Sequence, residues 1–149
     1  MPTDTARAEL RIRARVEDVL ESIHDVATQP EWIPEIKEAT VLDRTDEGLP
    51  LRAELAASTA VGTDRYTLVY EHLPDGVEWS MEQGRLQTGQ EGRLTAEPVG
   101  PAEDGLTLAA YELTIHHNLP LPGFIRSRTI KGLVSGTLEG LRKRHEASA

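Results

Sequence analysis

The sequence has no cysteine, so disulfide bonds and thiolate chemistry are both excluded. Positive charge is also scarce: 16 Lys and Arg stand against 25 Asp and Glu, which gives a formal net charge of −9 and an isoelectric point near 5.0. Proteins bind nucleic acids by placing clustered Lys and Arg on the phosphates, and an acidic surface repels them. The charge balance therefore argues against nucleic acid as a partner.

Long apolar segments are absent as well. No stretch approaches the run of about 18 apolar residues that a membrane-spanning helix needs, and the N-terminal MPTDTARAEL lacks the apolar core of a signal peptide. We therefore expect a cytoplasmic protein without stable membrane insertion. The 149 residues fit a single domain, which we place at residues 6–146, with a flexible tail at 1–5 and a second tail at 147–149.

The short signatures of common catalytic sites are also lacking. The chain has no G-x-S-x-G, no H-E-x-x-H and no glycine-rich phosphate loop. Of the five histidines only His116 and His117 are adjacent, and neighbours on a strand point to opposite faces, so they do not clasp one metal ion. We therefore expect no metal and no cofactor, and we assign no catalytic residue.

The N-terminal half combines a strand, a helix and several further strands. From Ala6 to Ala14 apolar residues alternate with charged ones, which is the period of a strand with one buried face. From Arg15 to Ala27 apolar residues recur at helical spacing, and Pro30 is expected to end this helix. Six more strands with short turns are predicted at about residues 35–44, 51–59, 64–73, 77–82, 86–97 and 106–116.

The last segment is predicted to be helical. Apolar residues recur at spacings of three and four between Phe124 and Leu141, which indicates one long amphipathic helix from about Pro122 to Glu146. Consecutive strands with hairpin-length links form an antiparallel sheet, and the long helix has to cover its apolar face. We therefore predict an α+β fold in which a curved seven-stranded antiparallel sheet wraps around the C-terminal helix. Two short helices lie between the first two strands, and space is left between sheet and helix.

Aromatic residues are few, with one Phe, two Trp and three Tyr, so their positions are informative. The strand period places five large side chains on the inner face of the sheet: Tyr66, Tyr70, Trp79, Met81 and Tyr111. Aromatic walls with a few hydroxyl groups are typical of pockets that hold planar or prenyl-like ligands. The alternative is that these rings simply fill the gap between the sheet and the helix.

Three segments carry a resemblance to a known superfamily. They are the opening strand AELRIRA, the segment VEDVLESIHDVATQPEWIPEIKE and the C-terminal LPLPGFIRSRTIKGLVSGTLEGLRKRHE. Within them the typical positions are occupied by Asp25, Val26, Pro30, Trp32, Pro34, Ile36, Lys37, Pro120, Pro122, Gly123 and Phe124. On these residues the chain resembles the START-like (SRPBCC) superfamily, in its bacterial polyketide cyclase/dehydrase-like or coenzyme Q-binding-protein-like branch.

The resemblance implies a helix-grip fold with an elongated apolar cavity between the sheet and the C-terminal helix. It places Trp32 on a short helical turn that closes one end of the cavity, where the ring either plugs the core or contacts a ligand. His117 either points into the cavity mouth as a candidate proton carrier or bonds to loop backbone. Arg126, Arg128 and Lys131 either form a solvated face or bind a ligand carboxylate or phosphate.

We predict that the protein binds a hydrophobic small molecule, such as an aromatic polyketide, an isoprenoid quinone or a lipid, as a monomer or a homodimer. The candidate ligand-binding residues are Trp32, Tyr66, Tyr70, Trp79, Met81, Tyr111, His117 and Phe124. One alternative is a polyketide aromatase/cyclase that uses the same cavity, with a tyrosine or His117 moving protons. A second alternative is a module that binds a protein partner in a larger complex.

Overall fold

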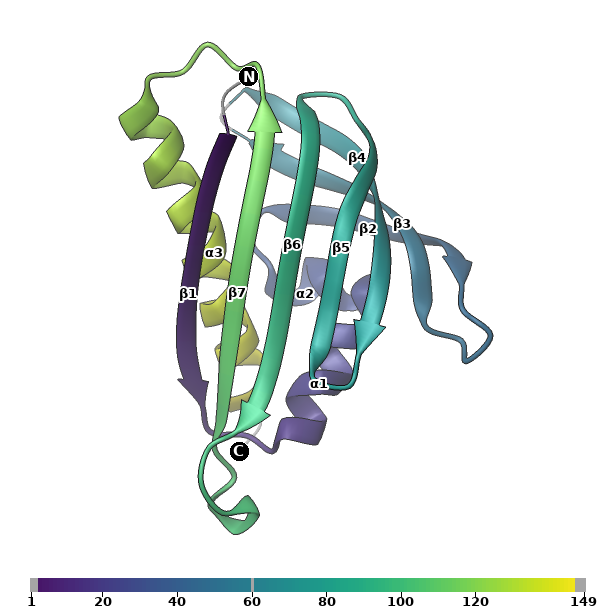
Figure 1. The fold of residues 1–149 in the computed structure, drawn as a ribbon, viewed down its shortest axis with the longest axis vertical. Helices are drawn as coiled ribbons and strands as arrows, with labels where there is room; N and C mark the ends of the chain where they lie inside the picture. Colours follow the sequence, from purple (N-terminus) through teal and green to yellow (C-terminus); the bar gives the residue numbers. More distant parts are fainter. Residues whose placement is uncertain (1–2, 60, 147–149) are drawn as a thin grey trace.

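One antiparallel sheet of seven strands forms the body of the molecule (Figure 1). The computed structural model describes residues 3–59 and 61–146. The strands lie in the spatial order β1-β7-β6-β5-β4-β3-β2, so that each hairpin pairs neighbours in sequence and β7 returns beside β1. The strands are β1 (Thr3–Ile12), β2 (Ile36–Arg44), β3 (Pro50–Thr59), β4 (Gly62–Leu73), β5 (Gly76–Gly84), β6 (Gln87–Pro98) and β7 (Thr107–His117).

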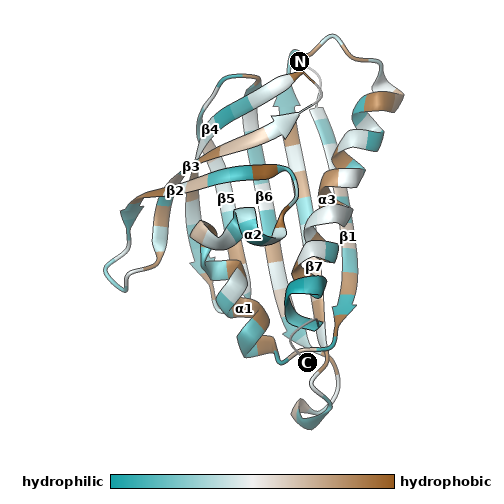
Figure 2. Ribbon diagram, turned by 180° about the vertical axis from the view of Figure 1, so that it is seen from behind, coloured by the Kyte–Doolittle hydropathy of each residue, from teal (hydrophilic) through white to brown (hydrophobic). Residues whose placement is uncertain are grey.

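All the α-helices cover one face of this sheet, as the view from behind shows (Figure 2). The long helix α3 (Gly123–Glu146) runs beside β1 and β7, and its 24 residues extend about 36 Å at about 1.5 Å per residue. The short helices α1 (Val16–His24) and α2 (Gln29–Trp32) lie between β1 and β2, joined by the 3₁₀ turn η1 (Val26–Thr28). A second 3₁₀ turn, η2 (Ala102–Asp104), connects β6 to β7. The predicted helix-grip fold is therefore confirmed.

The first helical region is divided differently from the prediction. Helix α1 ends at His24, and the chain passes through η1 before α2 begins. Pro30 lies in the first turn of α2, so the expectation that it terminates the preceding helix is wrong. The first turn of a helix tolerates proline because its N–H groups have no partner within the helix.

The N-terminal strand begins and ends earlier than the alternation indicated. Strand β1 begins at Thr3, and Thr3 to Thr5 pair with residues 114–116 of β7 instead of forming the expected tail. Residues 1–2 and 147–149 of the predicted tails lie outside the described residues. The early start of β1 places Asp4 at the end of the sheet where α3 begins.

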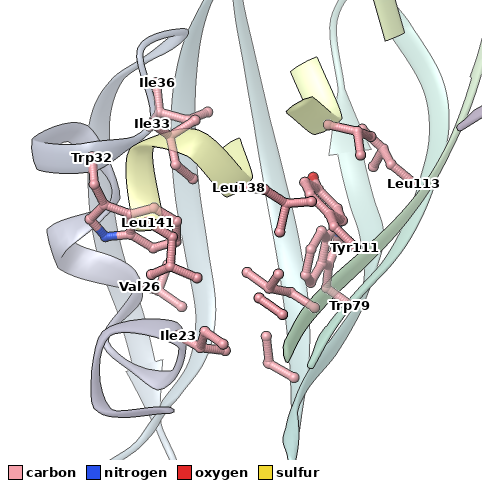
Figure 3. Packing of buried hydrophobic residues seen from close by; sticks show 14 of the residues in the cluster. Ile23, Val26, Trp32, Ile33, Ile36, Trp79, Tyr111, Leu113, Leu138 and Leu141 are labelled. Carbon is pink, nitrogen blue, oxygen red and sulfur yellow. The ribbon is translucent and has the colours of Figure 1, made fainter. Parts of the chain in front are cut away.

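A stripe of three glycines lies on α3, at Gly132, Gly136 and Gly140, every fourth residue. A Cβ atom at Gly140 would overlap the backbone carbonyl group of Trp32, so α2 packs directly on the backbone of α3. On its sheet-facing side α3 buries apolar residues such as Leu138 and Leu141, which meet side chains of the sheet and of the short helices (Figure 3). The core is thus dense at the α1 end of the molecule.

Candidate ligand-binding site

A cavity of about 380 Å³ lies between the sheet and α3. Pockets for small molecules in proteins typically enclose about 300–1,000 Å³ and are mostly apolar. The walls come from strands β3 to β7, from the α2–β2 connection and from α3, and include Leu55, Leu68, Leu94, Leu113, Ile130 and Leu133. The space that was predicted between sheet and helix is therefore present.

Five of the eight predicted site residues line this cavity: Tyr66, Tyr70, Trp79, Tyr111 and His117. The four aromatic rings come from inward-facing positions of β4, β5 and β7. Trp79 lies at the centre of the wall, with ring centroids 6.1 Å from Tyr70 and 5.7 Å from Tyr111. Gly92 leaves room for the indole, because a Cβ atom there would overlap the Trp79 ring.

The other three predicted residues do not line the cavity. Trp32 is buried between α2 and α3, where its Nε1 donates to Thr28 Oγ1 over 3.1 Å, so it fills the core. Met81 is partly buried and lies beside Gly84 near the end of β5. Phe124 is 70% exposed on the first turn of α3, and the first buried residue of this helix is Ile130.

Burial controls the ionisation of the cavity tyrosines. It raises the pKa of Tyr66, with the nearby Asp64 carboxylate as the second cause. Burial likewise raises the pKa of Tyr70, and it raises the pKa of Tyr111, to which Tyr66 and Glu35 also contribute. The three hydroxyl groups therefore stay protonated at neutral pH and act as neutral hydrogen-bonding groups.

Glu35 is a cavity residue that sequence analysis missed. The prediction placed Glu35 at the start of the strand at about residues 35–44, but it lies in the turn between α2 and β2, where strand alternation does not indicate the direction of the side chain. Its backbone carbonyl accepts a hydrogen bond from Ser58 N over 2.8 Å, which fixes the turn against β3. Its Oε2 atom is buried without a hydrogen-bond partner, and so is the hydroxyl oxygen of Tyr70.

A chain of hydrogen bonds runs along one wall of the cavity. Trp79 Nε1 donates to Gln90 Oε1 over 2.9 Å, and Gln90 Nε2 donates to Gln87 Oε1 over 2.8 Å. Gln87 Nε2 then donates to Asp64 Oδ2, and Leu86 N donates to Asp64 Oδ1, both over 3.0 Å. The buried Asp64 carboxylate is satisfied by two N–H donors, so this chain stabilises the wall.

Three side chains at the cavity mouth, Asp4, His117 and Arg126, form what we call the mouth cluster. His117 Nδ1 accepts from Leu119 N over 3.1 Å, so the proton lies on Nε2, which donates to Asp4 Oδ2 over 2.7 Å. Arg126 Nε lies 3.3 Å from the same Asp4 oxygen, and Arg126 Nη1 donates to the Leu121 carbonyl over 2.9 Å. Both ring nitrogens of His117 are engaged, so neither is free to transfer a proton to a ligand.

The three basic residues near the start of α3 do not all face the cavity. Arg126 and Arg128 line the mouth of the cavity, whereas Lys131 is exposed and does not line it. Arg126 is already bonded to Asp4 and to a backbone carbonyl. Among the described residues, no group of three His, Asp or Glu side chains could hold a metal ion.

A family model matches nearly the whole length of the chain. The family model described as polyketide cyclase / dehydrase and lipid transport matches residues 3–146. The chain belongs to this family. The match spans every strand and helix described above, so the polyketide cyclase/dehydrase and lipid transport family accounts for the complete helix-grip domain.

Solved structures share the same fold. One is a START superfamily protein from Mycobacterium smegmatis, with a TM-score of 0.86, 23% identity, and 97% of this chain and 99% of that chain covered. Another is the Zhui aromatase/cyclase from Streptomyces sp. R1128, with a TM-score of 0.73, 12% identity and 96% of both chains covered. A STAR-related lipid transfer protein from Xanthomonas axonopodis has a TM-score of 0.70 and 20% identity over 94% of this chain and 84% of that chain. No curated protein sequence matches this chain.

The length and hydropathy of the helices show whether one of them could span a membrane. Within residues 3–59 and 61–146, none of the helices has the length and apolar character that crossing a bilayer requires.

Proposed function

We propose that the protein binds a hydrophobic small molecule in the cavity between the sheet and α3. The observation that carries this proposal is the cavity itself: it has about 380 Å³ and a largely apolar wall, and it lies inside a domain whose buried apolar residues form one cluster. Protein interiors are usually close-packed, so an internal space of this size is unusual and indicates a binding cavity. An aromatic polyketide, an isoprenoid quinone and a lipid all have an apolar body suited to such a wall.

The family supports the same class of ligand. Its description joins polyketide cyclisation with lipid transport, and both activities handle largely apolar molecules. Two proteins of the same fold are named as an aromatase/cyclase and as a lipid transfer protein. We therefore place the ligand of this chain among apolar molecules with a small number of polar groups.

Mass spectrometry of the gently purified protein tests the proposal directly. We expect a copurified apolar small molecule, or stoichiometric binding of the fluorescent dye Nile red to the emptied protein. Leu133→Trp places an indole in the cavity and is expected to weaken Nile red binding at least about tenfold, because it occupies the ligand space. Ser135→Trp, at an exposed position of the same helix, is the matched control. Equal binding by both variants would contradict the proposal.

A polyketide aromatase/cyclase is the second candidate, and the unpartnered carboxylate of Glu35 is the observation that favours it. Cyclisation needs a group that accepts a proton from the substrate. The tyrosines stay protonated and His117 has both nitrogens engaged, so Glu35 is best placed to accept it. Turnover of a polyketide analogue that is lost in Glu35→Gln would support an enzyme, and the absence of turnover would leave the carrier.

A further inference from the structure

Two polar atoms inside the cavity have no partner. Among the residues that the structure describes, Glu35 Oε2 and the Tyr70 hydroxyl are the buried side-chain atoms that lack a hydrogen bond. Buried polar atoms in native proteins are nearly always hydrogen-bonded, so a pair of exceptions in one cavity requires an explanation. Both side chains line the proposed ligand space, which makes a ligand the natural partner.

The surroundings of Glu35 define what that partner has to supply. Tyr66 and Tyr111 lie within electrostatic reach of its carboxylate, since Glu35 contributes to raising the pKa of both. Gln29 lies near the Tyr70 hydroxyl but outside hydrogen-bond geometry. No Lys or Arg forms an ion pair with Glu35 within residues 3–59 and 61–146. An ionised carboxylate has only acceptor oxygens, so the site is short of a donor.

The glycine stripe of α3 leaves space over this carboxylate. A Cβ atom at Gly136 would lie 3.6 Å from Glu35 Oε1, so the helix presents only backbone there. At Gly132, one turn nearer the mouth, a Cβ atom would meet nothing within 4 Å. A ligand group therefore has room to approach Glu35 from the cavity side.

We propose that the bound molecule carries a hydrogen-bond-donating head, a hydroxyl or a protonated amine, which binds Glu35 and lies beside the Tyr70 hydroxyl. This inference rests on the proposed function and specifies its ligand class. The apolar body of the ligand lies along Trp79 and the leucines of the wall. An ionised Glu35 would repel a ligand carboxylate or phosphate in the interior. Arg126 and Arg128, which also line the cavity, lie at its mouth, where Asp4 holds Arg126.

Displacement of Nile red by four naphthalene derivatives at pH 7.5 tests the proposal. We expect 2-naphthol or 2-naphthylmethylamine to displace the dye at a concentration at least about tenfold lower than 2-methoxynaphthalene, because a site built for a donor rejects an analogue that lacks one. We expect 2-naphthoate to be at least about tenfold weaker than 2-methoxynaphthalene. The hydroxyl and amine arms distinguish the two kinds of donor.

Two substitutions at one position assign the effect to Glu35. Glu35→Leu is expected to abolish the preference for the donor ligands, and Glu35→Gln to abolish the amine preference and to admit 2-naphthoate. The matched control is Glu38→Gln, three residues further along the chain on β2, which is expected to leave all preferences unchanged. Its side chain is 60% exposed and paired with Arg65 at 3.0 Å. Thermal unfolding checks that each variant is folded. If Glu35→Leu does not fold, an unchanged amine preference together with continued rejection of 2-naphthoate by Glu35→Gln overturns the role of Glu35.

The outcomes separate this inference from the proposed function. If the wild-type protein binds Nile red but 2-naphthol, the amine and 2-methoxynaphthalene displace it equally, the donor-headed ligand is wrong and hydrophobic binding stands. A preference that survives unchanged in Glu35→Gln and Glu35→Leu overturns the role of Glu35. If Nile red and all four derivatives fail to bind, both proposals fall.

Discussion

At the scale of single residues, the three tyrosines of the chain all line one cavity. Burial is the main cause that raises the pKa of each. The absorbance of phenolate near 295 nm is therefore expected to stay constant as the pH rises through 10. A solvated tyrosine, by contrast, is half ionised at about pH 10. The measurement is a spectrophotometric titration of the folded protein, with the protein in concentrated urea as control.

The raised pKa of the three tyrosines also predicts how the stability of the protein changes at high pH. Because the pKa of each tyrosine is higher in the folded state, the folded protein binds more protons than the unfolded one above about pH 10. This contribution to stability is complete below that pH and is lost as the pH rises further. The phenolate signal is thus expected to appear together with unfolding, in one cooperative step. A gradual rise centred near pH 10 without loss of structure would contradict burial of these hydroxyls.

Strand alternation placed four of the five large side chains that it assigned to the inner face on the wall of the cavity, whereas Met81, near the end of β5, does not line it. Tyr66, Tyr70, Trp79 and Tyr111 lie within strands, and alternation was enough to place them on the inner face. Periodicity placed Glu35 at the start of a strand, whereas the structure places it in the turn before β2, and a turn has no fixed side-chain direction. Its importance depends on the absence of a hydrogen-bond partner, which only the assembled fold reveals.

At the scale of elements, the packing of α2 on α3 depends on Gly140. A Cβ atom there would overlap the Trp32 carbonyl oxygen, which belongs to backbone and cannot rotate away. Gly140→Ala is therefore expected to lower the free energy of unfolding by about 1–3 kcal/mol, the usual cost of overpacking. Chemical denaturation with urea measures the change.

Gly132→Ala is the matched control on the same helix. A Cβ atom at Gly132 would meet nothing within 4 Å, so the substitution brings only the higher helix propensity of alanine. It is expected to raise the free energy of unfolding by about 0.5–1 kcal/mol. If the two variants have equal stability, the close approach of α2 to α3 is wrong.

A histidine pair links α1 to β4. His24 Nδ1 and His72 Nδ1 lie 2.7 Å apart, and His72 Nε2 donates to the Pro50 carbonyl over 2.6 Å, so His72 Nδ1 is the acceptor. Burial, and then the neighbouring His72, lowers the pKa of His24. Since the unfolded state binds this proton more readily, stability is expected to fall as the pH decreases through about 6.5.

Replacement of His24 tests this link. His24→Asn keeps a donor for His72 but removes the titrating group, so the melting temperature is expected to fall less between pH 7.5 and pH 5.5 than in the wild type. Burial, followed by the charge of Arg144, also lowers the pKa of His145, so adding His145→Gln is expected to flatten the profile further. An unchanged pH profile in both variants would show that these histidines titrate alike in the folded and unfolded states.

Element boundaries were predictable to within a few residues, with two instructive exceptions. The two short helices predicted between the first two strands are present, but periodicity extended the first of them to Ala27, whereas α1 ends at His24 and the turn η1 follows. The start of β1 was placed too late because Thr3 to Thr5 are polar and belong to the sheet through backbone pairing with β7. For β1 the decisive contacts are made with residues distant in the sequence.

At the scale of the whole molecule, the mouth cluster joins elements from both ends of the chain. Asp4 on β1 contacts His117 on β7 and Arg126 on α3, across sequence separations of 113 and 122 residues. Sequence analysis named His117 and Arg126 but had no means to supply Asp4, because a single polar residue in an expected tail carries no pattern. These three side chains fix the start of α3 against the sheet and so define the mouth of the cavity.

Asp4→Ala is expected to affect both stability and ligand exchange. It leaves the buried His117 Nε2–H without an acceptor and removes the ion pair of Arg126, which is expected to cost about 1–3 kcal/mol in the free energy of unfolding. The start of α3 then loses a tie to β1, so Nile red is expected to dissociate faster, as measured by stopped-flow fluorescence. Arg7→Ala on the same strand is the control, since the Arg7–Glu112 pair is more than half exposed and such pairs contribute at most about 1 kcal/mol. Equal dissociation rates in Asp4→Ala and the wild type would mean that ligands enter by another route, and that the mouth cluster stabilises the fold without controlling access.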